Sequence, residues 1–106
     1  MPIYLLEVSY TVDGTKGLIA EGGSKRRDTV KKLVEGLGGK LESFYYAFGE
    51  DDCYVIVELP DDTAAAATSL AVGASGAASI TTKVLLAPEV IDAAAKKDVG
   101  YRPPGK

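Results

Sequence analysis

The feature that most constrains the fold is a pair of strand-like runs joined by a short turn. Residues 40–48 (KLESFYYAF) and 52–59 (DCYVIVEL) are rich in aromatic and β-branched residues, which favour extended chain. Gly49-Glu50-Asp51 separates the two runs, and a glycine followed by acids is typical of a turn. The spacing predicts an antiparallel hairpin in the middle of the chain, and the other elements have to be arranged around it.

Strand and helix patterns alternate on both sides of this hairpin. Residues 3–11 and 80–86 alternate as strands do, whereas residues 15–37 have helical spacing that Gly22-Gly23 interrupts. Ser24 is the N-cap that we expect for the segment after the interruption. A helix of very small side chains is expected after Pro60, and a short helix over residues 88–97.

The order β-α-β-β-α-β predicts an α+β fold of the ferredoxin-like kind. In that sandwich a four-stranded antiparallel sheet, in the spatial order 4-1-3-2, carries two helices on one face. We expect a single domain over residues 1–97 and a flexible tail over residues 98–106. Leu70 and Val72 are expected to anchor the alanine-rich helix.

Alternation along the strands assigns one face of the sheet to the helices and leaves the other uncovered. The helix-covered face is expected to hold Tyr4, Leu6, Val8, Tyr10, Phe44, Tyr46, Phe48, Cys53, Val55, Val57, Leu59, Ile80, Val84 and Leu86. The uncovered face carries a larger apolar patch than monomers usually expose, made of Ile3, Leu5, Tyr45, Tyr54, Ile56 and Leu85. We therefore expect a homodimer or higher homo-oligomer with sheets face to face, a dimeric α/β barrel.

Polar residues on the same uncovered face form the candidate site. Glu7 and Lys83 are expected on neighbouring strands, where they could form an ion pair, because buried charges need partners. One interpretation is a structural ion pair with interface tyrosines. The other is a small-molecule pocket that uses Glu7, Tyr45, Tyr54 and Lys83, because ligand sites combine apolar walls with a few convergent polar groups.

Composition excludes several classes of function. The chain has 106 residues and no histidine, so catalysis by Ser-His-Asp or Cys-His and zinc sites of the Cys/His kind are ruled out. The net charge of −3 argues against nucleic acid as a partner. No membrane span or leader peptide is expected, and a single cysteine, Cys53, fits a cytoplasmic protein. Cys53 is expected to be an inert core residue.

Two charged clusters are interpreted as solvated surface. The acidic run Glu50-Asp51-Asp52 is expected to be an exposed turn, because consecutive acids cannot all converge on a metal ion. The basic group over residues 25–32 follows a glycine pair but lacks the spacing of a phosphate-binding loop. We expect neither a metal nor a cofactor.

The hairpin and its flanks resemble the GYD domain family. The similarity covers nearly the whole chain and includes Gly38-Gly39-Lys40-Leu41, Phe44-Tyr45, Gly49, Asp52 and Glu58-x-Pro60-Asp61. Gly49 and Asp52 match the motif Gly-x-Tyr-Asp, whereas Asp51 stands in place of its tyrosine. The family consists of small, mostly bacterial proteins that look like dimeric α/β barrels and have no settled activity.

The resemblance leaves three functions open. The motif is also similar to the effector-binding domain of leucine-responsive regulators, which bind small molecules between subunits, but no helix-turn-helix is present. The first function is a small accessory or sensing module that binds a small molecule at the dimer interior. The second is a cofactor-independent enzyme with Glu7, Tyr45 or Lys83 as acid and base groups. The third is a purely structural or assembly protein.

Overall fold

The computed structural model describes all 106 residues and contains four strands and four helices. In chain order these are β1 (Ile3–Tyr10), α1 (Val12–Glu21), α2 (Gly23–Gly36), β2 (Lys40–Tyr46), β3 (Cys53–Glu58), α3 (Asp62–Ala74), β4 (Ala78–Leu85) and α4 (Pro88–Ala95). The predicted hairpin is present as β2 and β3, and the α+β class is confirmed.

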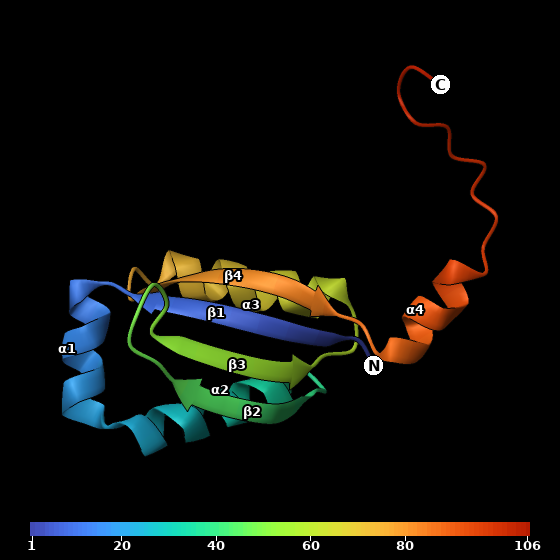
Figure 1. Cartoon of the computed structure of the whole chain (residues 1–106). Helices are drawn as coiled ribbons and strands as arrows, with labels where there is room; N and C mark the ends of the chain where they lie inside the picture. Colours follow the sequence, from blue (N-terminus) through green and yellow to red (C-terminus); the bar gives the residue numbers. More distant parts are fainter.

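The four strands form one antiparallel sheet in the order β2-β3-β1-β4 (Figure 1). This is the strand order 4-1-3-2 expected from the sequence. The central strand β1 pairs on one side with β3, where Leu5 faces Ile56, and on the other with β4, where Leu5 faces Lys83. An irregularity between Leu41 and Ser43 shifts the register of β2 against β3.

The core lies between the sheet and helices α2 and α3, which both cover the same face (Figure 1). Val34 from α2 and Ala65 from α3 are buried against the side chains that β1 and β3 turn toward the helices. These strand residues are also buried: Tyr4, Leu6, Cys53, Val55 and Val57. Leu59, just after β3, completes this cluster. The predicted assignment of the two faces is therefore correct for the central strands, because the period of two leaves no other register.

The prediction of the helix-covered face is wrong for residues at the ends of the strands. Phe48 is fully exposed, because β2 ends at Tyr46 and Phe48 belongs to the turn. Val84 and Leu86 at the end of the edge strand are more than half exposed. Leu70 is 74 % exposed and does not anchor α3. The buried side of that helix is formed by Ala65 and Thr68, with Val72 half-buried, and Leu70 lies off this stripe.

The connection from β1 to β2, the first crossover, contains the two helices α1 and α2, and their ends differ from the prediction. Thr11 caps α1 by accepting a hydrogen bond from Gly14 N at 3.2 Å, so the helix begins at Val12 rather than at residue 15. Gly22, with φ at 93°, ends α1 and is itself the N-cap of α2. Ser24 is therefore not a cap. The positive φ that glycine tolerates lets the chain turn between the two helices.

The second crossover and the C-terminal segment differ in how they are held. Asp61 caps α3 by accepting from Ala64 N at 2.9 Å, and Asp62 accepts a hydrogen bond from the Tyr4 hydroxyl. Helix α4 and residues 96–106 have only exposed residues and lie beyond the end of the sheet, away from its core (Figure 1). No helix of the chain combines the length and apolar character that crossing a membrane requires.

Candidate functional site

The uncovered face of the sheet brings the predicted site residues onto neighbouring strands. Glu7 on β1 is directly opposite Tyr54 on β3, and Tyr54 is directly opposite Tyr45 on β2. These three residues therefore form one row across three strands. Lys83 on β4 lies one row further along, opposite Leu5.

Glu7 and Lys83 form the ion pair that the sequence predicts. Glu7 Oε1 lies 2.8 Å from Lys83 Nζ, although the contact does not have the angles of a good hydrogen bond. The Glu7 side chain is only 16 % exposed, whereas that of Lys83 is 59 % exposed. The short polar contact with Glu7 and the charge of its carboxylate raise the pKa of Lys83, so this ammonium stays protonated at neutral pH.

Tyr54 is held in an acidic part of this face. Burial raises the pKa of Tyr54, and the negative charges of Asp51 and Glu7 raise it further. Its phenol therefore remains a hydrogen-bond donor at neutral pH. Tyr45 is 72 % exposed and lies at the edge of the row. Glu7, Tyr54 and Lys83 thus form a compact polar group, and Tyr45 marks its outer margin.

The acidic turn contributes to this group, which the sequence interpretation did not foresee. Ser9 on the uncovered face donates its hydroxyl to Asp51 Oδ1 at 3.0 Å. Asp52 connects the turn to β1 by two hydrogen bonds of 2.8 Å. Its Oδ2 accepts a hydrogen bond from Tyr10 N, and its backbone N donates one to Val8 O. Asp51 and Asp52 are half-buried, so the prediction of a fully solvated turn is wrong for them.

The cause is the length of β1. That strand continues to Tyr10, beyond Val8, the last residue that pairs with β3. Its final backbone and hydroxyl donors therefore need acceptors, and the acids of the turn supply them. The sequence feature that could have predicted these contacts is the run of acidic residues directly before β3.

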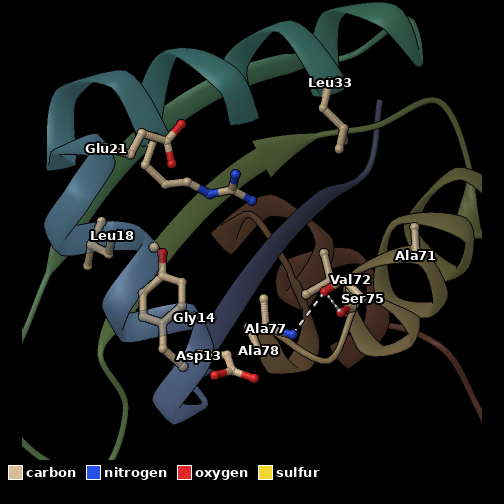
Figure 2. Close-up of a pocket in the computed structure, with 13 residues that line it drawn as sticks. Asp13, Gly14, Leu18, Glu21, Leu33, Ala71, Val72, Ser75, Ala77 and Ala78 are labelled. Atoms are coloured by element: carbon tan, nitrogen blue, oxygen red, sulfur yellow. Dashed lines mark hydrogen bonds between the residues drawn. The ribbon is translucent and has the colours of Figure 1, made fainter.

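A hollow lies on the opposite, helix-covered side of the sheet, between α1, α2 and α3 (Figure 2). Its volume is about 370 Å³. It is surrounded by Leu18 and Glu21 of α1, Leu33 of α2, Val72 of α3, and Ser75 directly after α3 (Figure 2). A narrower apolar recess of about 60 Å³ is lined by some of the same residues and by core residues of the sheet down to Cys53.

Arg26 lines both the hollow and the recess, which corrects its assignment to a solvated basic face. It is half-buried, unlike its neighbours Lys25 and Arg27. Helical spacing contained this signal, because Arg26 precedes Val30 by four residues and Leu33 by seven. Positions with that spacing share one side of a helix.

Cys53 is an inert core residue, as predicted. It is buried, and this burial raises the pKa of its thiol to about 11, with a further contribution from Asp52. Burial also raises the pKa of Tyr10, above the recess, to about 12. Neither group ionises near neutral pH, so neither is an activated nucleophile.

The fold and the uncovered face together define a small α+β protein whose sheet is covered by helices on one side only. The chain belongs to the GYD domain family, whose model matches residues 4–95. This match extends from β1 to the last residue of α4 and confirms the predicted resemblance. No curated protein and no solved structure matches the chain.

Proposed function

We propose that this protein is a ferredoxin-like homodimer, with its sheets packed face to face as a dimeric α/β barrel. It would bind a small molecule between the two sheets and serve as an accessory or sensing module. The observation that best supports this proposal is the Glu7–Lys83 ion pair, at 2.8 Å, on a sheet face that no helix of its own chain covers. Tyr54 adjoins the pair, and Tyr45 would lie at the rim.

The apolar neighbours of this pair support the dimer. Leu5 on β1 and Ile56 on β3 are directly opposite one another. Ile3 on β1 and Leu85 on β4 are opposite one another in the next row on the same face. Together they form an apolar area beside the polar group. Soluble monomers seldom leave such an area in water, and a second copy with the same face would cover it symmetrically.

The protonation states in the polar group favour binding over catalysis. A general base needs a pKa close to the working pH. The pKa values of Tyr54 and Lys83 are both raised, away from neutrality, so both groups keep their protons and act as hydrogen-bond donors rather than as bases. A phenol, an ammonium and a carboxylate in fixed positions are suited to orienting a polar ligand in an apolar chamber.

The test is native mass spectrometry of freshly purified protein, with light scattering in solution for the oligomeric state. We expect a dimer that carries removable extra mass. The variants Tyr54→Phe and Lys83→Met should stay dimeric and lose that mass. The matched control is Lys40→Met, which removes an exposed lysine of β2 whose ion-pair partner is Glu42, at 3.8 Å.

Each outcome has a definite meaning. A monomer would refute the proposal, because the uncovered face would then be stable in water. A dimer without added mass would favour the structural or assembly alternative. Retention of the ligand by Lys83→Met, at the level of the Lys40→Met control, would show that the ligand binds elsewhere.

A further inference from the structure

The hollow between α1, α2 and α3 is separate from the proposed dimer interface, because it lies on the helix-covered side of the sheet. It exists because the side chains on the α3 side are small: Ala71 lies beside Val72, and Ser75 follows directly after the helix. Helix α1 runs along one end of the sheet and turns into α2 at Gly22 (Figure 1). The space of about 370 Å³ therefore stays unfilled by the chain itself.

Charges of both signs line this hollow without neutralising one another. Arg26 contributes a guanidinium, and Asp13 and Glu21 contribute carboxylates. None of the three takes part in any of the three ion pairs of the structure, which join Arg27 to Asp28, Lys40 to Glu42 and Lys83 to Glu7. Glu21 is the last residue of α1 and Asp13 lies in its first turn, so the two carboxylates lie at opposite ends of this helix (Figure 2).

The recess beside Arg26 is apolar and small. Its walls include Val30, Leu33, Phe44, Val72 and Ile80. At roughly 10–15 Å³ for each water-sized group, its volume of about 60 Å³ accommodates about four to six non-hydrogen atoms. That is the size of a short aliphatic chain.

We infer that this hollow binds a small zwitterion with a short aliphatic side chain, of the α-amino acid type. Its carboxylate contacts the Arg26 guanidinium, whose planar fork matches carboxylate geometry. Its ammonium contacts Glu21, which lies at the same end of α1 as Arg26, and its aliphatic chain enters the recess. A simple anion would pair with Arg26 and leave the carboxylates without a partner, and a simple cation would leave Arg26 without one. A ligand with both charges is the kind that satisfies groups of both signs.

The test compares three probes that share one carbon chain. L-Norleucine carries both charges, pentylamine lacks the carboxylate, and hexanoate lacks the ammonium. Titrations followed by amide NMR of the full-length protein report both the affinity and the place of binding. We expect saturable shifts around Leu33, Val72 and Ala78 with L-norleucine, and affinities lower by about tenfold or more with either analogue.

The diagnostic variant is Arg26→Met, with Arg27→Met as its matched control. Arg27 is the next residue of α2, is exposed, and pairs only with Asp28, at 3.2 Å. We expect Arg26→Met to lower the affinity for L-norleucine by about tenfold or more and Arg27→Met to leave it unchanged. If Arg26→Met does not fold, Glu21→Gln serves instead and should narrow the preference for L-norleucine over hexanoate.

Three results would overturn the inference. The first is the absence of saturable shifts with every probe, and the second is equal affinity for all three. The third is a set of shifts confined to Glu7, Tyr54 and Lys83, which would place binding on the other face of the sheet. That last result would leave the proposed dimer-interior site standing, so the two proposals can fail separately.

Discussion

Replacement of Gly14 by alanine is the sharpest test of the packing between the first and second crossovers. Gly14 lies in the first turn of α1, and a Cβ atom there would be 1.9 Å from the carbonyl oxygen of Ala77 and 3.2 Å from the Tyr10 ring. Because the nearest atom belongs to the backbone, α1 or the turn before β4 has to move. Hydrogen bonds from Thr11 to Gly76 O at 2.8 Å and to Ala77 O at 2.9 Å hold that turn in place.

The magnitude follows from three contributions. Overpacking of this kind costs about 1–3 kcal/mol. Weakening one or two of the hydrogen bonds costs about 0.5–1.5 kcal/mol each. Alanine in place of glycine in a helix returns up to about 1 kcal/mol. Gly14→Ala should therefore lower the free energy of unfolding by roughly 0.5–6 kcal/mol.

The same helix supplies a control with the opposite sign. A Cβ atom at Gly17 would have no neighbour within 4 Å. Gly17→Ala should therefore raise the free energy of unfolding by about 0.5–1 kcal/mol. Urea unfolding followed by circular dichroism measures both variants. The reasoning is refuted if Gly14→Ala is as stable as the wild type, or if both variants are destabilised equally.

Four other predictions concern single groups. The pKa of Tyr4 is raised from 10.0 to about 12 by its hydrogen bond to Asp62 and by burial, so its stabilising effect is complete below about pH 10 and is lost as the pH rises through about 12. Tyr4→Phe should remove this part of the alkaline decline in unfolding free energy, and an unchanged decline would contradict the assignment. The Cys53 thiol, with its pKa near 11, should react with a thiol reagent only after unfolding; rapid labelling of native protein at neutral pH would show that it is accessible. Asp52→Ala leaves the last backbone N–H of β1 without its acceptor and should lower the free energy of unfolding by about 1–3 kcal/mol, whereas a neutral effect would mean that water replaces the carboxylate. Ile56→Glu should give a folded monomer by light scattering, because it places a charge in the proposed interface, and a persistent dimer would locate that interface elsewhere.

Local sequence patterns were sufficient to predict which side of the central strands is buried. Alternation with a period of two determined which side of β1 and β3 is buried, and the structure agrees for Tyr4, Leu6, Val55 and Val57. The same alternation, combined with the expected strand order, predicted that Glu7 and Lys83 lie on adjacent strands of the uncovered face, and the structure agrees. A one-residue shift would have reversed every side chain, which is why so short a pattern carries so much information.

Features that depend on where elements end were harder to predict. Phe48 continues the aromatic pattern of β2 but lies outside the strand, and Leu70 is the largest apolar residue of α3 but points away from the core. Size and hydrophobicity alone do not determine burial. The side that a helix turns toward the sheet is set by all of its contacts together, and small residues such as Ala65 can occupy that side.

The sequence by itself determined the strands, the buried side of the central sheet and the family, because these follow from periodicity and from short motifs. Only the tertiary structure decided that Asp51 bends back to Ser9 and that Arg26 faces a hollow between three helices. Asp51 and Ser9 are 42 residues apart in the chain. The hollow depends on the spacing between helices, which their packing on the sheet sets and which no local pattern encodes.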